Sequence, residues 1–480
     1  MKENILRKLG RVKEAEELHK ESLKIDPLYD RQPEKINHNT LLELVIDLYE
    51  AGDYAQGITL AEKWVKQQNV SRQEDIYPLV YYYIAYGYQN LHRKENTEQA
   101  NCYMTMYVTL GENAAADGCF PHRTEDYIVL KSLAEEYHLA MAYYYLGCLL
   151  YDRRVYDESI EDYEESILRS PDFPTVHRNL ALAYYNVKKL PQRAYEEMEK
   201  AFALDETDAR VYLELDQLKK RLNVAVKERW SDMEKHFDLV ESRDDLYLEY
   251  VTLLNTLGEP EKALGLIKAR KFHQWEGGEG KVAAQYLTAL YQLAKAAVEK
   301  EDYAEAKELL LRAVGEYPHN LGEGKLESGQ ENNLYYLLGL VQEKLGEAKD
   351  AFESLTRACC GESEPVGMMY YNDQPPEMIY YQGLAYRMLG EEEQAVRRFQ
   401  KLVDYGREHI RDDVKIDYFA VSLPDLLIFE ENLNERNRKH CLFMVSLGLK
   451  GLGRIDEAEK CAEELLAMDN AHQEIRVHDL

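Results

Sequence analysis

Residues 143–171 read YYYLGCLLYDRRVYDESIEDYEESILRSP, and the rest of the chain repeats the pattern of this stretch. Tyr143 and Gly147 recur at the spacing of one helix face, and Ser159 and Tyr163 do so again after a short polar run. A proline then ends the pattern. The stretch therefore predicts two consecutive helices with a turn between them.

These residues resemble a tetratricopeptide repeat, in which two antiparallel helices pack through small residues at the eighth and twentieth positions. Here Gly147 and Ser159 hold those positions. Aligning the other second helices on Ser159 places small residues at Ala15, Gly57, Ala100, Ala194, Ala263, Ala306, Ala351, Ala395 and Ala458. Glycines that can end the first helix precede many of these by five residues, at Gly10, Gly52, Gly258, Gly346, Gly390 and Gly453.

The repeats predict an all-α fold, a right-handed α-solenoid of about eleven tetratricopeptide-like helix pairs with four loop interruptions. A degenerate repeat is expected over about 207–242. No window of the sequence alternates as a strand does. Helical-hairpin solenoids of other families are the structural alternative, because most spacings between units exceed the usual period of about 34 residues.

The interruptions divide the chain into repeats and inserts. We expect repeats over 1–110 with the first one truncated, a loop insertion over 111–128, repeats over 129–268, a Trp- and Gly-rich loop over 269–281, and repeats over 282–480 with inserts near 361–376 and 407–437. The chain begins in the middle of a repeat, so we expect it to be the C-terminal part of a longer protein. A natural capping turn is the alternative.

The formal net charge of −29 argues against nucleic acid and against an anionic membrane surface as partners. Apolar runs are shorter than the roughly 20 residues that span a bilayer. The cysteines, seven in number, show no disulfide framework. We expect a soluble cytoplasmic protein, unless the sequence lacks its leader.

Tyrosine dominates the aromatic residues, with 38 copies against 10 Phe and 3 Trp. In a tetratricopeptide superhelix the first helices line the concave face, and the resemblance assigns their fifth and twelfth positions to it. Those positions hold Tyr82, Tyr144, Arg178, Tyr291, Tyr336 and Tyr380, and Tyr151 and Tyr185, respectively. We expect these side chains to contact a ligand in a groove, because phenol rings suit a peptide backbone, an Arg side chain or a sugar face. If the register is off by one residue, they are ordinary packing between helices.

Catalytic signatures are missing from the sequence. The GGEGK stretch that ends at Lys281 lacks the hydroxyl residue and the preceding strand of a phosphate-binding loop. We expect its glycines to seat Trp275, and Glu276 and Glu279 to cap the next helix. No Cys-x-x-Cys or His-Glu-x-x-His occurs. We therefore expect no catalytic residues, no metal, no cofactor and no enzyme activity in this chain.

A second resemblance lies in the interruptions. ARKFHQWEGGEGK, NDQPPEMIYYQGLAYRMLG and DYFAVSLPDLLIFEENLNERN look like the C-terminal repeat region of large bacterial proteins, in which a β-sandwich domain of unknown function precedes tetratricopeptide repeats. This resemblance implies a role for the interruptions, although no mechanism is known for it. The loop-site candidates are Trp275, Glu276, Gly277, Gly278, Asn372, Asp373, Tyr418 and Asp425.

Two functions remain open. The leading hypothesis is a non-catalytic interaction scaffold, whose superhelical groove binds a protein or peptide segment or the N-terminal domain of the same protein. The alternative is an accessory region that binds or processes carbohydrate, with Trp275 and Tyr418 as stacking platforms and carboxylates such as Asp373 and Asp425 beside them.

Overall fold

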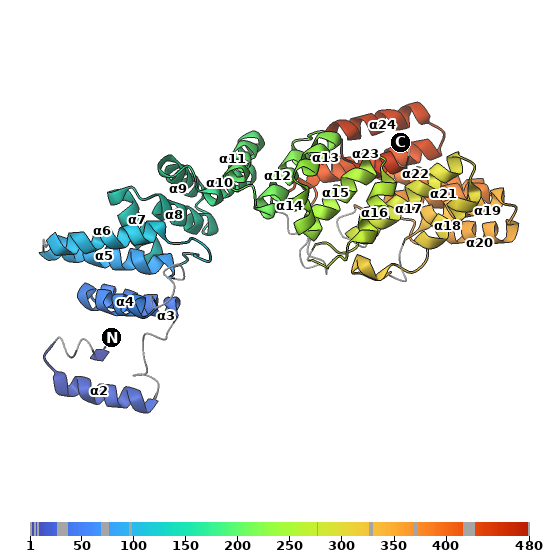
Figure 1. Ribbon diagram of the computed structural model, residues 1–480. Coiled ribbons are helices and arrows are strands. Elements are labelled where there is room, and N and C mark those ends of the chain that lie inside the picture. Colours follow the sequence, from blue (N-terminus) through green and yellow to red (C-terminus); the bar gives the residue numbers. More distant parts are fainter. Residues whose placement is uncertain are drawn as a thin grey trace. The chain divides into compact units, whose positions relative to one another are not determined.

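The computed structural model describes residues 2–3, 6, 9–25, 37–68, 76–95, 98–275, 277–325, 330–367, 373–415 and 428–478. Over these residues the secondary structure is helical, with no strand, which confirms the all-α prediction. The chain divides into two compact units, Met1–Ala183 and Tyr184–Leu480 (Figure 1). In the described part of the chain, no helix has both the length and the apolar character needed to cross a membrane.

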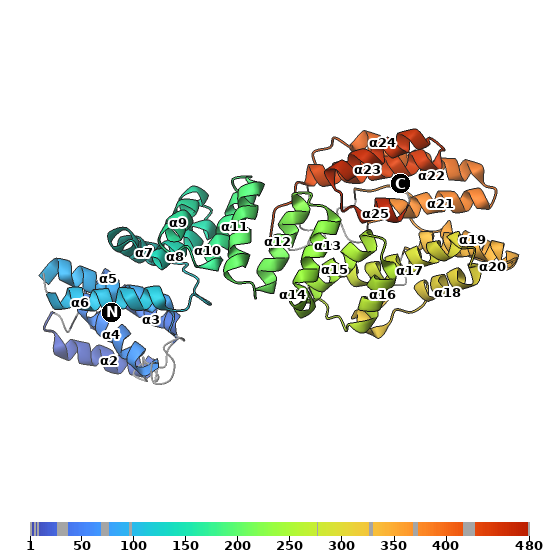
Figure 2. The same cartoon turned by 45° about the horizontal axis from the view of Figure 1, so that its top comes forward.

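The first unit is a series of helical hairpins (Figures 1 and 2). Its helices are α2 (Val12–Ile25), α3 (His38–Glu50), α4 (Tyr54–Gln68), α5 (Pro78–Glu95), α6 (Glu98–Asn113), α7 (Thr124–Tyr137), α8 (Ala140–Asp152), α9 (Tyr156–Arg169) and α10 (Pro174–Asn186), whose last residues belong to the second unit. Residues 143–171 form most of the α8–α9 hairpin. Helix α7 adds a helix between two hairpins.

The second unit continues the same pattern. Its helices are α11 (Pro191–Leu204), α12 (Ala209–Arg221), α13 (Val226–Lys235), α14 (Phe237–Ser242), α15 (Asp244–Thr256), α16 (Pro260–Ala269), α17 (Lys281–Glu299), α18 (Tyr303–Ala313), the 3-10 helix η3 (His319–Leu321), α19 (Asn332–Lys344), α20 (Ala348–Ala358), α21 (Pro376–Met388), α22 (Glu392–His409), α23 (Leu433–Gly451), α24 (Ile455–Met468) and α25 (Gln473–Val477). Both views place α23 beside α13 (Figures 1 and 2). The amide of Asn223, after α12, donates to the carbonyl oxygen of Ala467 in α24 at 3.1 Å. The end of the unit therefore packs against its beginning.

Close approach of the two helices holds each hairpin together. The hydroxyl of Ser159 donates to the carbonyl oxygen of Gly147 at 2.7 Å. A Cβ added to Gly147 would lie 2.5 Å from the ring of Tyr163, so only glycine fits there. The aligned small residues are all buried within helices, at Ala15, Gly57, Ala100, Ser159, Ala194, Ala263, Ala306, Ala351, Ala395 and Ala458. The predicted alignment of the helices is thereby confirmed, whereas the division into repeats and inserts stays a prediction.

The turn between the helices has a left-handed residue at a repeated position. The glycines expected there have φ between 73° and 82°, at Gly10, Gly52, Gly258, Gly346, Gly390 and Gly453. Three hairpins place a residue with a side chain at the same position, namely Arg154 (φ 62°), Lys189 (φ 55°) and Glu301 (φ 60°). Asn223 (φ 58°) marks the turn between α12 and α13 in the degenerate repeat. A left-handed conformation costs a residue with a Cβ about 1–2 kcal/mol.

Replacing the left-handed Glu301 with glycine is expected to raise the free energy of unfolding by about 0.5–1 kcal/mol, because strain is removed while some chain entropy is lost. The neighbouring Lys300→Gly is the matched control, since Lys300 has an ordinary φ of −85°. It is expected to lower the same free energy by a few tenths of a kcal/mol. Urea unfolding measures the change in unfolding free energy for both variants. Equal changes would contradict backbone strain at Glu301.

Candidate functional site

Four of the predicted groove tyrosines are buried. The exposed fraction is 0% for Tyr82, 3% for Tyr291, 6% for Tyr380 and 7% for Tyr144. The hydroxyl of Tyr82 donates to a carboxylate oxygen of Glu112 at 2.6 Å, so its polar end is also occupied. In this structure Tyr82, Tyr144 and Tyr380 pack between helices, and Tyr291 lies against the imidazole of His478, with ring centroids 5.6 Å apart, so none of the four rings has an open face. The burial of these rings gives no support to the prediction that they contact a ligand.

The other members of the set are half-buried. They are Tyr151, Arg178, Tyr185 and Tyr336. The ring of Tyr151 packs edge-on against Tyr156, with centroids 5.2 Å apart. The ring of Tyr185 contacts Phe429 edge-on at 5.1 Å. Ligand contact by these four residues stays a prediction.

In the Trp- and Gly-rich loop, a glycine packs against Trp275, as expected. The N–H of Gly278 donates to the carbonyl oxygen of Trp275 at 2.9 Å, and a Cβ on Gly278 would lie 2.4 Å from the indole ring. The expected cap of α17 needs a correction, because Glu323 accepts from the N–H groups of Gly280 and Ala283, both at 2.8 Å. A distant carboxylate, rather than Glu279, therefore satisfies this helix terminus.

The remaining loop candidates are dispersed. Gly277 and Asp373 are half-buried, on two different segments of the second unit. Glu276, Asn372, Tyr418 and Asp425 lie outside the described residues. No contact among the described residues supports the carbohydrate alternative.

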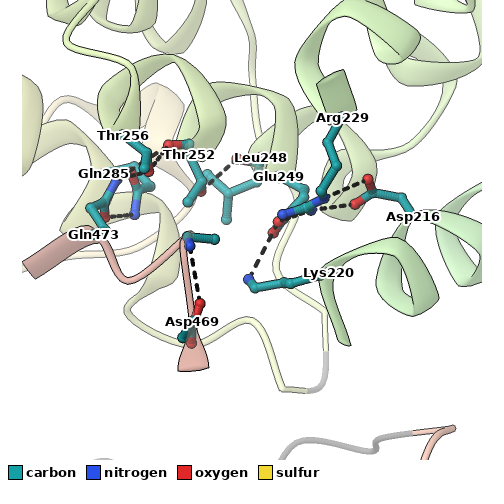
Figure 3. Close-up of polar contacts among 11 residues, drawn as sticks. Asp216, Lys220, Arg229, Leu248, Glu249, Thr252, Thr256, Gln285, Asp469 and Gln473 are labelled. Carbon is teal, nitrogen blue, oxygen red and sulfur yellow. Dashed lines mark hydrogen bonds and ion pairs between the residues drawn. The ribbon is translucent and has the colours of Figure 1, made fainter. Parts of the chain in front are cut away.

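Several polar contacts in the second unit involve residues 469–478, here called the C-terminal segment. Gln473 at the start of α25 exchanges two hydrogen bonds with Gln285 of α17, at 2.9 and 3.1 Å (Figure 3). Its amide nitrogen also donates to the carbonyl oxygen of Thr252 at 3.2 Å and to the hydroxyl of Thr256 at 3.3 Å. One side chain thus links the segment to α15 and α17.

Lysines hold the end of the same segment by its main chain. Lys295 of α17 donates to the carbonyl oxygen of Val477 at 2.9 Å, and Lys450 of α23 donates to that of His478 at 3.3 Å. Ile475 is fully buried and Val477 is 5% exposed. Hereafter the segment-binding face denotes Thr252, Thr256, Gln285, Tyr291, Lys295, Tyr381 and Lys450.

A hydrogen-bonded chain leads from the segment-binding face to the imidazole of His478. The Nδ1 of His478 lies 2.9 Å from the hydroxyl of Tyr381, which lies 2.6 Å from the hydroxyl of Tyr291. The Nε2 lies 3.1 Å from a carboxylate oxygen of Glu474. Burial of Tyr381, with Tyr291 beside it, raises the pKa of its phenol well above the usual range. The phenol of Tyr381 therefore stays neutral and acts as a hydrogen-bonding group.

Beside this face, a buried ion-pair network fixes α15 (Figure 3). Arg229 of α13 is 1% exposed and donates to both carboxylate oxygens of Asp216 at 2.9 and 2.6 Å, and to Glu249 at 2.7 Å. Burial raises the pKa of Glu249, but Lys220 and Arg229 outweigh it and lower that pKa to about 2. Such a network is costly to break, because removing one partner leaves a buried charge. It holds α15, which carries Thr252 and Thr256, against α12 and α13.

A second internal segment is held by its main chain. The side-chain amide of Asn186 donates to the carbonyl oxygen of Ile428 at 2.9 Å and accepts from the N–H of Glu430 at 2.8 Å. Phe429 between them is fully buried, and the guanidinium of Arg221 lies 5.6 Å from its ring. One amide side chain therefore binds an extended stretch of backbone in both directions.

The sequence reasoning missed the C-terminal segment as a functional feature. The partners of Gln473 lie 188 to 221 residues away in the chain. Glutamine, lysine and threonine at these places look like ordinary polar helix residues. The one signal in the sequence was the alternation of Ile475 and Val477 beyond the last repeat.

Comparison with known proteins identifies the repeats. Residues 144–209 and 291–365 match one family model, and residues 377–405 match a second, both described as tetratricopeptide repeat. The matched stretches include α9 and α19 in full and most of α22.

Solved structures of similar chains share low identity with this one. A tetratricopeptide repeat protein from Parabacteroides merdae ATCC 43184 is 14% identical, over 63% of this chain and 98% of that chain, with a TM-score of 0.24. YrrB, described as a TPR protein with an unusual peptide-binding site, is 18% identical over 52% and 96%, with a TM-score of 0.19. The apo form of the quorum sensor NprR from B. thuringiensis is 12% identical over 90% and 98%, with a TM-score of 0.26. These similarities assign no site to this chain.

The environment of His440, on α23, predicts a pH dependence. Its Nε2 lies 2.8 Å from the carbonyl oxygen of Val366, and burial lowers its pKa to about 4, with Arg436 and His472 acting in the same direction and Asp373 against it. Because the pKa is lower in the folded state, the stability from neutral His440 is complete above about pH 6.5 and is lost as the pH falls toward 4.

We expect this loss to reach about 3 kcal/mol of unfolding free energy at pH 4. His440→Gln keeps a donor for Val366 but cannot titrate, so its unfolding free energy should fall less over the same range. Urea unfolding at pH 7, 5.5 and 4 measures both proteins. Parallel curves for the two proteins would refute a role for His440.

Proposed function

Because the chain contains tetratricopeptide repeats, which suggest a protein-interaction scaffold, we propose that its second unit binds a peptide segment of a partner protein on the segment-binding face. The observation that carries this proposal is the C-terminal segment of the chain itself, which lies on that face. Its main-chain carbonyl oxygens accept hydrogen bonds from Lys295 and Lys450. A foreign peptide can use the same donors.

The contacts define the kind of peptide that fits. Main-chain contacts accept many sequences, so specificity comes from the side chains that the face buries. In the C-terminal segment these are Ile475 and Val477, together with half-buried Gln473, which is hydrogen-bonded to the face, at alternate positions. A partner segment of the form Gln-x-Ile-x-Val, with β-branched residues at the last two named positions, presents the same groups.

The net charge of the chain further limits the class of partner protein. At −29 the chain attracts partners that are basic or neutral overall and repels acidic ones. Tetratricopeptide-repeat proteins are generally non-catalytic, which fits a scaffold rather than an enzyme. The N-terminal domain of a longer chain is proposed as one partner, and half-buried Tyr151, Arg178, Tyr185 and Tyr336 are proposed as separate contact points.

The C-terminal segment acts as a competitor in this proposal. It is tethered, so its effective concentration at the face is on the order of millimolar. A partner peptide must displace the segment. The apparent affinity of the peptide is therefore lower than its intrinsic affinity, in proportion to the fraction of molecules in which the face is free. Weakening the segment should therefore strengthen binding of a peptide added from outside.

A labelled peptide with the sequence of residues 469–478 tests the proposal by fluorescence anisotropy. We expect weak binding to the wild-type chain and at least tenfold tighter binding to Ile475→Ala/Val477→Ala, in which the tethered segment loses buried apolar contacts. Circular dichroism checks that the double variant keeps its helices.

Adding Lys295→Met to the double variant should remove most of the gained affinity, because the donor to the peptide carbonyl is lost. Lys300→Met is the matched control, since Lys300 is exposed at the end of the same helix α17. A peptide with the same residues in scrambled order controls for charge. Equal binding of the scrambled peptide, or equal loss in both lysine variants, would refute the proposed site.

A further inference from the structure

We infer that Glu377, Glu474 and His478 form a binding site for a divalent transition-metal cation, which fastens the C-terminal segment to α21. The inference does not depend on the proposed peptide binding, and a peptide that displaces the segment would remove Glu474 and His478 from the site. It combines one residue of the repeat scaffold with two residues of the segment.

The geometry of the three side chains suits a cation. A carboxylate oxygen from each glutamate and a ring nitrogen of His478 all lie within 4.8 Å of one another. Glu474 and His478 are four residues apart at α25, so both side chains lie on the same face of the helix. Glu377 comes from the first turn of α21, a different element. A cation between them would contact both elements.

Glu377 supplies an independent observation. Its residue is 7% exposed, yet within the described residues its carboxyl group has no hydrogen-bond donor besides its own backbone N–H. It faces Glu474 instead, and two neighbouring buried carboxylates are unfavourable unless a proton or a cation neutralises one of them. The nearby Lys295 and Lys450 are directed at main-chain oxygens of the segment. The arrangement therefore leaves a place for a positive charge.

His478 is already oriented as a ligand. The hydroxyl of Tyr381 holds Nδ1 at 2.9 Å, and Tyr291 holds that hydroxyl in turn at 2.6 Å. Metal-binding histidines usually donate the N–H of one ring nitrogen to an oxygen, which directs the other nitrogen to the metal. With the proton on Nδ1, the lone pair of Nε2 points toward Glu474, the side on which Glu377 lies. Tyr381 is then a positioning residue.

The ligand set determines the class of metal. Two carboxylate oxygens and one imidazole nitrogen suit Mn²⁺ or Zn²⁺ better than Mg²⁺, which prefers an all-oxygen shell rich in water. The side chain of Glu474 is 41% exposed, so solvent reaches one side of the site. Water can therefore complete the coordination shell, and the cation has a path of entry.

Mn²⁺ is the suitable probe, because the free cysteines of this chain are soft ligands that favour Zn²⁺. Electron paramagnetic resonance of free Mn²⁺ during a titration of the full chain measures binding. We expect about one Mn²⁺ per chain that Zn²⁺ displaces. Glu377→Gln and His478→Gln are each expected to weaken Mn²⁺ binding at least tenfold, because each removes a ligand. Glu463→Gln, an exposed residue on α24, is the control for charge and should bind as the wild type does.

Hydrogen exchange of residues 469–478 gives a second readout. Mn²⁺ should slow exchange in the wild-type segment and leave Glu377→Gln unchanged, provided that both proteins have the same circular dichroism spectrum. Absence of saturable Mn²⁺ binding by the wild-type chain would overturn the inference, and so would binding that Glu377→Gln does not alter. Peptide binding measured with EDTA present tests the proposed scaffold function separately.

Discussion

The close approach of two helices at a small residue is the constraint on which every hairpin of this protein depends. A Cβ at Gly147 would meet the ring of Tyr163, and one at Gly383 would lie 2.5 Å from the ring of Phe399. In these two hairpins a large ring fills the space that the missing side chain leaves, and at Gly339 the side chain of Leu355 does so. Because this contact recurs along the chain, neighbouring hairpins present similar faces to each other, and they stack.

A different interaction completes the second unit. Amide and ammonium groups donate to main-chain oxygens of segments that lie 28 to 244 residues further along the chain. Asn186 binds the backbone around Phe429, Lys295 and Lys450 bind the C-terminal segment, and Asn223 binds the end of α24. These contacts depend on the backbone of the bound segment more than on its side chains. A surface that holds its own chain in this way is suited to hold another chain.

The sequence predicted the hairpins well, because a small residue and a turn glycine recur at fixed spacing and act locally. It did not reveal that Arg154, Lys189 and Glu301 adopt the glycine conformation, since the surrounding helices impose that conformation on them. The exposure of the predicted groove tyrosines depends on which face of each first helix its neighbours cover. A shift of the helix register by one residue moves a ring such as Tyr82 from the surface into the core. The C-terminal segment was beyond prediction, because its partners are distant in the chain and have no periodicity.

The contact between Asn223 and Ala467 joins residues 244 positions apart. An open repeat array can form one hairpin at a time, since each repeat needs only its neighbours. The second unit cannot be completed one hairpin at a time. Contacts of the α12 and α15 regions with the end of the chain form only after those last residues have been synthesised. During synthesis at about 5–20 residues per second, these surfaces stay uncovered for many seconds after they emerge from the ribosome. The segment-binding face of the second unit is therefore open to other chains during synthesis, before residues 469–478 cover it.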